Sequence, residues 1–387
     1  MYKIQTLNKI SNIIHTQLDA SYQISDSETA PDAILVRSAA MHEMEFAPGL
    51  LAIGRAGAGV NNIPIDRCSK AGIVVFNTPG ANANAVAELV ICGLLLSGRK
   101  IADGIDWAKT LKGKGAEVGK LVEKGKSQFV GPEMRGKTLA VIGLGAIGAL
   151  VANAASRGLG MKVVGYDPFI SVEHAWSLST SIHRAESADE AIANADYVTF
   201  HVPLMDQTRG SINADMIGKM KDGVTILNFS RGELADAAAV LEALQNGKVS
   251  KYVTDFPSDE MLCQENVICL PHLGASTPES EENCASMAAA EIRDYLEFGS
   301  IHHSVNFPDV QLGKPEGARI LVLHENIPNT ISPISAAVSA EGINIDNLIN
   351  KSRKEMALTV MEVPKLPSQA ALDKIAKIPG VCRIRTF

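Results

Sequence analysis

The sequence predicts an α/β protein with two Rossmann-like lobes, each a doubly wound parallel sheet, followed by a smaller ferredoxin-like βαββαβ domain. Three observations predict this fold. Short β-branched runs alternate with helical stretches, which is the pattern of βαβ units. These runs are apolar throughout, as in sheets that are covered on both faces. The chain has 387 residues, enough for two or three domains.

The order of the predicted elements divides the chain. Apolar strands are predicted at 33–36, 50–53 and 73–76, and then at 138–142, 162–166, 197–202, 224–229, 252–256 and 267–270. The lysine- and glycine-rich stretch 112–126 is interpreted as an exposed connection between two lobes. A long helix from Pro278 to Phe298 is expected to return the chain to the first lobe. The predicted domains are a substrate-binding lobe (1–98 and 283–310), a nucleotide-binding lobe (99–282) and a C-terminal domain (318–387).

The composition restricts the classes of partner. Lys and Arg total 36 against 43 Asp and Glu, a net charge of −7, so neither nucleic acid nor an anionic membrane is expected as the main partner. The six cysteines form no CxxC motif, which argues against a zinc ribbon, and no metal site is predicted. Neither a signal peptide nor a membrane-spanning run is recognisable, so a cytoplasmic protein is expected.

A dinucleotide-binding motif follows the strand at 138–142. Gly143-Leu144-Gly145-Ala146-Ile147-Gly148 matches GxGxxG and opens a helix predicted at 146–157. The first glycine permits the tight turn, the second lets a pyrophosphate approach, and the third allows close packing of the helix. Asp167 ends the next strand, 19 residues beyond Gly148 (167 − 148), where a carboxylate binds the ribose hydroxyls and repels a 2′-phosphate. The motif therefore predicts NAD rather than NADP.

Polar side chains end three successive strands of the same lobe. Arg231 follows 224–229, Asp259 and Glu260 follow 252–256, and His272 follows 267–270. The carboxyl ends of parallel strands meet at one edge of a sheet, so these groups are expected to converge. A histidine base, a carboxylate that orients it and an arginine that grips a substrate carboxylate are the groups that oxidation of a hydroxy acid requires.

The chain resembles the D-isomer-specific 2-hydroxyacid dehydrogenases. The resemblance rests on several ordered motifs: Gly54 to Ile63, Phe76 to Pro79 with Ala87 to Leu89, Gly143 to Gly148, His201 to Leu204, Asn228 to Gly232, and Pro271 to Thr277. It implies that Arg231 binds substrate and that His272 is the acid–base residue. Matching the family's Asp-Val-Phe motif leaves two candidates for the catalytic carboxylate, with Glu260 preferred to Asp259 for its longer side chain.

The resemblance also implies the residues that contact cofactor and substrate. The implied NAD contacts are Gly143, Gly145, Ala146, Ile147, Gly148, Asp167, Pro168, His201, Val202, Pro203, Thr208, Phe229, Ser230, Asp255, His272 and Gly274. The implied substrate contacts are Arg37, Ser38, Arg55, Ala56, Gly57, Asn84, Arg231 and His272.

Two arginines predict the class of substrate. Arg37 and Arg55 end neighbouring strands of the first lobe, where they are placed to bind a second anionic group such as a phosphate; ordinary surface ion pairs are the alternative. Together with the resemblance, this implies NAD-dependent oxidation of 3-phospho-D-glycerate to 3-phosphohydroxypyruvate. The alternatives are a glyoxylate or hydroxypyruvate reductase, and a non-enzymatic NAD-sensing protein on the same scaffold.

The last 70 residues resemble an ACT domain, a small-molecule regulatory module. Strands are predicted at 319–323, 342–345, 357–363 and 381–384, with helices at 331–341 and 368–377 between them. The resemblance implies a site for L-serine formed by His324, Asn326 and Asn344; a purely dimerising domain is the alternative. The family also implies a homo-oligomer that is at least a dimer through the nucleotide-binding lobe.

Overall fold

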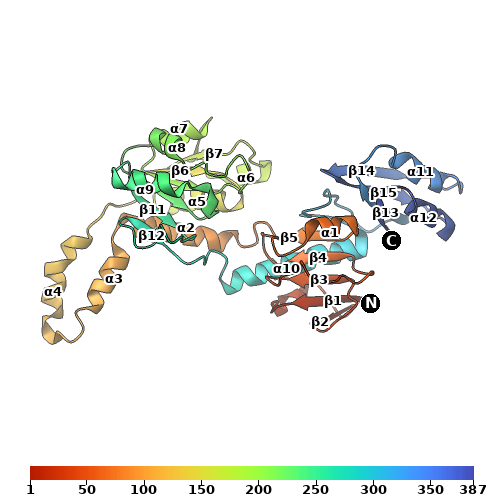
Figure 1. Cartoon of the computed structure of the whole chain (residues 1–387), viewed down its shortest axis with the longest axis horizontal. Helices are drawn as coiled ribbons and strands as arrows, with labels where there is room; N and C mark the ends of the chain where they lie inside the picture. Colours follow the sequence, from red (N-terminus) through yellow and green to blue (C-terminus); the bar gives the residue numbers. More distant parts are fainter. The chain divides into compact units, whose positions relative to one another are not determined.

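Three β-sheets organise the chain in the computed structural model, which describes residues 1–387 (Figure 1). By their contacts, residues Met1–Ala81 and Pro278–Phe387 form one unit, and Asn82–Thr277 form a second. The predicted α/β class with two Rossmann-like parallel sheets is confirmed. The predicted boundaries at 98 and 283 stay a prediction.

The first unit contains a five-stranded parallel sheet in the order β2-β1-β3-β4-β5. Its strands are β1 (Tyr2–Leu7), β2 (Tyr22–Ser25), β3 (Ala33–Val36), β4 (Ala52–Arg55) and β5 (Val74–Asn77), accompanied by the 3-10 turn η1 (Asn12–Thr16) and helix α1 (Ile65–Lys70). Helix α10 (Pro278–Phe298) has the predicted bounds and ends at Gly299, whose φ of 70° suits glycine.

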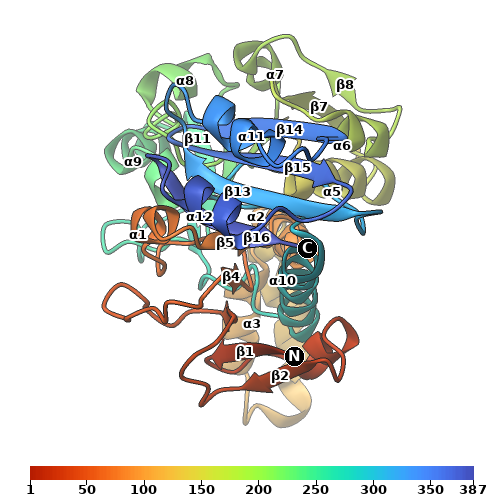
Figure 2. The ribbon, with the colours of Figure 1, turned by 90° about the vertical axis from the view of Figure 1, so that its right-hand side faces the viewer.

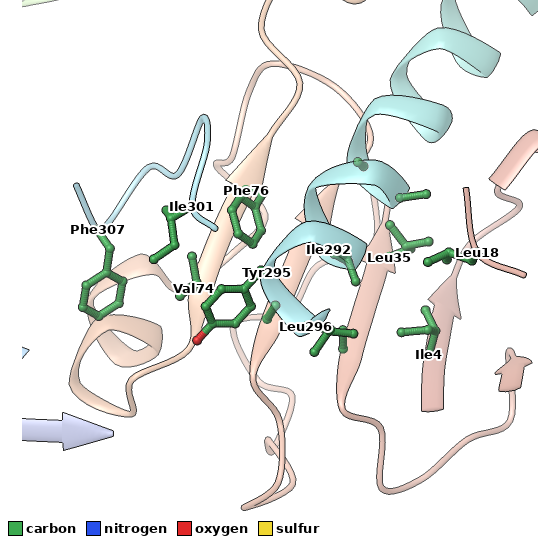
Figure 3. Close-up of a cluster of buried hydrophobic side chains, with 14 of the residues drawn as sticks. Ile4, Leu18, Leu35, Val74, Phe76, Ile292, Tyr295, Leu296, Ile301 and Phe307 are labelled. Carbon is green, nitrogen blue, oxygen red and sulfur yellow. The ribbon is translucent and has the colours of Figure 1, made fainter. Parts of the chain in front are cut away.

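Helix α10 buries one face of this sheet. Figure 3 shows its side chains Ile292, Tyr295 and Leu296 beside those of the strands, and all three are fully buried. Gly54 of β4 allows the helix to approach closely, since a Cβ there would lie 2.8 Å from Cδ1 of Ile292. The sheet therefore depends for its core on a helix that lies far from it in the sequence.

The second unit contains a seven-stranded parallel sheet in the order β12-β11-β10-β9-β6-β7-β8. The chain runs outward from β6 in one direction and then from β9 in the other, which places the switch point of a doubly wound fold between these two strands. The strands are β6 (Thr138–Ile142), β7 (Lys162–Tyr166), β8 (His183–Arg184), β9 (Tyr197–Phe200), β10 (Val224–Asn228), β11 (Val249–Thr254) and β12 (Val267–Cys269).

Helices of the second unit connect these strands or precede them. They are α2 (Ala83–Gly98), α5 (Ala146–Asn153), α6 (Val172–Ser177), α7 (Ala188–Ala193), α8 (Ala214–Lys219) and α9 (Ala237–Gln245). The helix predicted to continue to residue 157 ends earlier, because the backbone widens into a π turn at Ala154–Gly158.

The stretch 112–126 is exposed, as predicted, but its interpretation as a connection between two lobes is wrong, because it lies within the unit Asn82–Thr277 and contains a helix. Helices α3 (Ile101–Lys109) and α4 (Val118–Gly125) form a hairpin that stands apart from the sheet of its unit in Figure 1. Trp107 and Phe129 close the hairpin with ring centroids 5.3 Å apart. The lysines of this stretch were interpreted as those of a solvated connection, whereas lysines in α4 lie on the polar face of an amphipathic helix.

The C-terminal domain is ferredoxin-like, with the antiparallel order β14-β15-β13-β16 (Figure 2). Its elements are β13 (Ala318–Glu325), α11 (Ile331–Ser339), β14 (Asn347–Arg353), β15 (Met356–Val363), α12 (Gln369–Ala376) and β16 (Val381–Thr386). The strand predicted at 342–345 is displaced to β14, an edge strand whose largely exposed residues lack the apolar pattern of a buried strand. Asn329 adopts a φ of 63°, in the left-handed region that asparagine tolerates better than most residues.

Candidate active site

The glycine motif forms a turn between β6 and α5 that fits a phosphate group. Gly143 has a φ of 92°, and a Cβ there would lie 2.5 Å from the carbonyl oxygen of His201. A Cβ on Gly148 would overlap the carbonyl oxygen of Gly143. At Gly145, which caps α5, a Cβ would meet no atom within 4 Å, so there is open space beside the start of the helix, where N–H groups without helical partners favour an anion.

Asp167 holds this turn in place. Its Oδ2 accepts a hydrogen bond from the N–H of Leu144 at 2.8 Å, and its Oδ1 accepts one from the N–H of Phe169 at 2.8 Å. Each carboxylate oxygen has a second lone pair, so Asp167 retains the capacity to bind ribose hydroxyls. Pro168, which follows it, is exposed.

The loop after β9 borders the same turn. His201 Nε2 lies 3.0 Å from the hydroxyl of Thr199, whereas its buried Nδ1 has no hydrogen-bond partner. Burial lowers the pKa of His201 to about 4, so the ring is neutral at physiological pH. Thr208 orders the loop by donating a hydrogen bond to the carbonyl of Pro203 at 2.6 Å.

Three groups follow β10, β11 and β12, which are neighbours in the sheet. The side chain of Arg231 is exposed, and its Nη1 donates to the carbonyl of Ser230 at 2.6 Å. Asn228 fixes the backbone here by donating to the carbonyl of Arg231 at 2.9 Å. His272 is exposed, and its ring centroid lies 4.6 Å from that of Phe256. The structure thus brings Arg231 and His272 to one edge of the sheet, as the sequence predicts.

The carboxylates in this region differ sharply in environment. Asp259 and Glu260 are both exposed, and neither makes a hydrogen bond or ion pair with His272. Asp255 is 1% exposed, and its Oδ1 has no hydrogen-bond partner. Burial raises the pKa of Asp255, and the positive charges of His272 and Arg231 oppose that rise. Sequence reasoning placed Asp255 among the cofactor contacts and missed its electrostatic link to both catalytic candidates.

Of the remaining predicted contacts in this unit, some are buried or already hydrogen-bonded within the protein, and others are accessible. Phe229 is buried and packs on α2, since a Cβ on Gly93 would lie 2.6 Å from its ring, so only its backbone is available to a ligand. Ser230 donates its hydroxyl to the carbonyl of Phe200 at 2.7 Å. Ala146, Ile147, Val202 and Asn84 are not fully buried, and Asn84 donates its amide to Glu88 at 2.8 Å.

Arg37 and Arg55 lie side by side in the first unit. Val36, the residue before Arg37, pairs with Arg55 across β3 and β4. Arg55 is half-buried and its Nε has no partner. Burial lowers the pKa of Arg55, and the charge of Arg37 acts in the same direction. Two guanidinium groups at one sheet edge favour an anionic ligand.

Glu281 and Gly57 determine the surroundings of Arg37 and Arg55. Nη2 of Arg37 lies 2.7 Å from Oε1 of Glu281 in the first turn of α10, an ion pair of the kind expected from the sequence as the alternative for this arginine. Gly57 has a φ of 142°, and a Cβ there would overlap Nη1 of Arg55. The neighbouring Ala56 is buried, and the backbone N–H of Ser38 donates to Asn8 at 3.1 Å.

The three residues implied as a serine site do not share one environment. His324 is 3% exposed, and its ring nitrogens lie 2.8 Å from the carbonyl of Glu325 and 3.0 Å from the hydroxyl of Thr359. Asn326 donates its amide to the carbonyl of Lys354 at 3.0 Å, and Asn344 donates to Asp346 at 2.7 Å. Both nitrogens of His324 are therefore engaged within the domain.

No group of three or more His, Cys, Asp and Glu side chains is arranged to hold a metal ion. None of the helices combines the length and apolar character needed to cross a membrane.

Comparisons with known proteins point to one family. Residues 95–274 match the model of the D-isomer-specific 2-hydroxyacid dehydrogenase NAD-binding domain. The D-3-phosphoglycerate dehydrogenase of Haemophilus influenzae is 32% identical over 356 residues, which cover 89% of this chain and 83% of that protein. The enzyme of the same name from Archaeoglobus fulgidus is 36% identical over 293 residues, covering 72% of this chain. That match spans only 52% of the Archaeoglobus protein, so the chain matches about half its length.

Solved structures agree. The NAD⁺-bound 3-phosphoglycerate dehydrogenase of Entamoeba histolytica is 27% identical, with a TM-score of 0.60, and the match covers 79% of this chain and 98% of that one. The D-mandelate dehydrogenase of Rhodotorula graminis gives a TM-score of 0.67 at 21% identity, covering 80% and 99% of the two chains, and supports the fold alone.

Proposed function

Because the chain belongs to the D-isomer-specific 2-hydroxyacid dehydrogenase family, we propose that it oxidises 3-phospho-D-glycerate to 3-phosphohydroxypyruvate with NAD, the first step of L-serine biosynthesis. The observation that carries the choice of substrate is the pair of neighbouring arginines, Arg37 and Arg55. A hydroxy acid without a second anionic group leaves two half-buried cations without a counter-charge beyond Glu281.

The residues around the glycine turn fit NAD. Gly145 leaves room for a pyrophosphate at the start of α5, and Asp167 offers a carboxylate to the adenosine ribose. The unpartnered atoms Nδ1 of His201 and Oδ1 of Asp255 are buried polar groups that a bound ligand would satisfy. When bound, NAD supplies the acceptor for the hydride that leaves C2 of the substrate.

The catalytic roles follow from the chemistry of the side chains at the sheet edge. His272 takes the proton of the C2 hydroxyl, and the ring of Phe256 keeps its imidazole in place. Arg231 binds the substrate carboxylate and polarises the forming carbonyl. A carboxylate stabilises the imidazolium that forms. This carboxylate is either Glu260 or Asp259, after a movement of their exposed loop, or the buried Asp255.

The function is tested by measuring NADH formation with a panel of D-2-hydroxy acids. We expect the highest kcat/KM with 3-phospho-D-glycerate, and lower values with D-glycerate, glycolate and D-lactate, which lack the phosphate. Arg37→Ala should raise KM for the phosphorylated substrate and leave KM for D-glycerate unchanged. Equal kcat/KM for the phosphorylated and non-phosphorylated acids would instead support a glyoxylate or hydroxypyruvate reductase. No turnover of any acid, together with NAD binding, would support the sensing protein.

We propose that the C-terminal domain acts mainly through its contacts with the rest of its unit and not as a serine receptor. The buried, fully hydrogen-bonded His324 supports this choice, because serine would have to displace its bonds to Glu325 and Thr359. Calorimetric titration with L-serine should show no binding heat, and activity should not fall. Inhibition that is lost in Asn344→Ala would establish the effector site instead.

We also propose a homodimer formed through the α3–α4 hairpin. No residue within α3 or α4 is buried. The apolar side chains of Ile105 and the nearby Val130 are 53% and 75% exposed. Apolar side chains on a projecting hairpin are typical of a surface that a second copy covers. Ile105→Glu should lower the mass measured by light scattering from dimer to monomer, whereas Lys120→Glu on the polar face should not. A monomeric wild-type protein would refute the proposal.

A further inference from the structure

Helix α10 connects the candidate phosphate-binding arginines to the C-terminal domain. In its first turn, Glu281 forms the ion pair with Arg37. One turn later, the buried Cys284 lies close enough to Arg55 to influence its pKa. Further along, Ile292 packs on Gly54, the residue before Arg55. The position of α10 therefore sets the surroundings of both arginines.

The opposite end of α10 is held by arginines of the C-terminal domain. The last carbonyls of a helix have no partner within the helix and carry partial negative charge. Arg385 of β16 donates from Nη1 to the carbonyl of Tyr295 at 2.6 Å and from Nη2 to that of Leu296 at 2.8 Å. Arg319 of β13 donates to the carbonyl of Phe298. Two strands of the domain thus bind three carbonyls at this end of the helix.

The arginine contacts lie within an apolar interface. The guanidinium of Arg385 lies 4.6 Å from the ring centroid of Tyr295, and Arg385 is only 9% exposed. Leu321 and Leu358 of the domain share one buried cluster with Tyr295 and with Ile292 of α10. The domain and the helix are consequently packed as one body, and a displacement of the domain would displace the helix.

We propose that Arg385 is a positioning residue for the substrate phosphate: it fixes α10, and α10 fixes Arg37 and Arg55. A helix is stiff along its axis, so a shift at Tyr295 reaches Glu281, about 20 Å away at 1.5 Å per residue. The inference rests on the proposed function, because it takes the two arginines as the phosphate-binding pair.

The test compares two arginines of the same strand. Arg385→Gln removes the two bonds to α10, whereas the matched variant Arg383→Gln removes bonds to the carbonyls of Ala71, at 3.0 Å, and Pro48, at 3.5 Å, neither of which belongs to that helix. We expect Arg385→Gln to raise KM for 3-phospho-D-glycerate about fivefold or more, with kcat and KM for NAD within about twofold of wild type. Arg385→Lys, which keeps a cation at the helix end, should recover part of the loss, and Arg383→Gln should behave as wild type.

A double variant separates a positioning role of Arg385 from a general loss of stability. Substitutions more than about 10 Å apart usually have additive effects. If Arg385 acts through Glu281 and Arg37, the effects of Arg385→Gln and Glu281→Gln on KM should be less than additive. Unchanged KM in Arg385→Gln, equal effects of the Arg383 and Arg385 variants, or full additivity would overturn the inference. If Arg385→Gln does not fold, Arg319→Lys provides the same comparison through the carbonyl of Phe298.

The failure of this inference and that of the proposed function give different results. Wild-type protein without activity on 3-phospho-D-glycerate would remove the proposed function itself. Wild-type activity that depends on Arg37 but not on Arg385 would leave the function standing and remove only the role of α10.

Discussion

Replacing Gly57 by alanine should disable one half of the candidate phosphate site. The new Cβ would overlap Nη1 of Arg55, so the guanidinium must leave its position. The backbone also opposes the change, because a φ of 142° is accessible to glycine and strained by about 1–3 kcal/mol in other residues. Loss of one charged hydrogen bond to the substrate costs about 1.5–3 kcal/mol, which corresponds to a rise in KM of roughly 10- to 150-fold.

The assay is steady-state NADH formation with 3-phospho-D-glycerate and with D-glycerate. We expect the rise in KM only for the phosphorylated substrate, with KM for NAD unchanged. Gly59→Ala is the matched control, because a Cβ there meets only Oδ1 of Asn61 at an ordinary 3.7 Å. An unchanged KM in Gly57→Ala, or an equal rise in Gly59→Ala, would refute the assignment of Arg55 to the phosphate.

Three other predictions concern the cofactor, the acid–base residues and a buried carboxyl group. Asp167→Ala should raise KM for NAD and narrow the ratio of kcat/KM between NAD and NADP; an unchanged ratio would remove Asp167 from cofactor selection. If the partner of His272 is Asp259 or Glu260, one of Asp259→Ala and Glu260→Ala should lower kcat about 100-fold or more and shift the pH–rate profile, and the other should do neither; loss in both would contradict a single partner, and loss in neither would leave Asp255 as the partner. Burial raises the pKa of Glu291 to about 9, above its unfolded value, so its contribution to stability is present at low pH and is lost as pH rises towards 9. Glu291→Gln should therefore raise the melting temperature relative to wild type more at pH 8.5 than at pH 5, and an equal shift at both values would count against this reading.

The sequence was most informative where an element has a strong pattern of its own. Strands β6 and β7 and helix α10 occur with the predicted bounds, because a continuous apolar run or a strong helix start and stop leaves few alternatives. Strands β1 and β2 were not singled out, since β1 contains a single buried residue, Ile4, and polar residues interrupt both. Such strands are specified by pairing with their neighbours and not by their own pattern, although only β2 lies at the edge of the sheet.

In the candidate site, too, some residues could be predicted from the sequence and others could not. The glycine turn, Asp167, Arg231 and His272 follow from motif and strand order, because parallel strands bring their ends together. The carboxylate is different, since the direction of a side chain in the segment after β11 depends on tertiary packing. The burial of Asp255 and the exposure of Asp259 are therefore visible only in the structure.

The dependence of the first sheet on α10 also has a consequence for synthesis. Strands β1 to β5 leave the ribosome before the whole of Asn82–Thr277, and the helix that covers them emerges only afterwards. At about 5–20 residues per second, that interval lasts on the order of 10 to 40 s. The second unit is continuous in the sequence and can fold during this time. The apolar face around Leu35 and Val74 remains exposed until α10 has been synthesised. The nascent chain is thus most exposed to aggregation and chaperone binding at its beginning, although that part was made first.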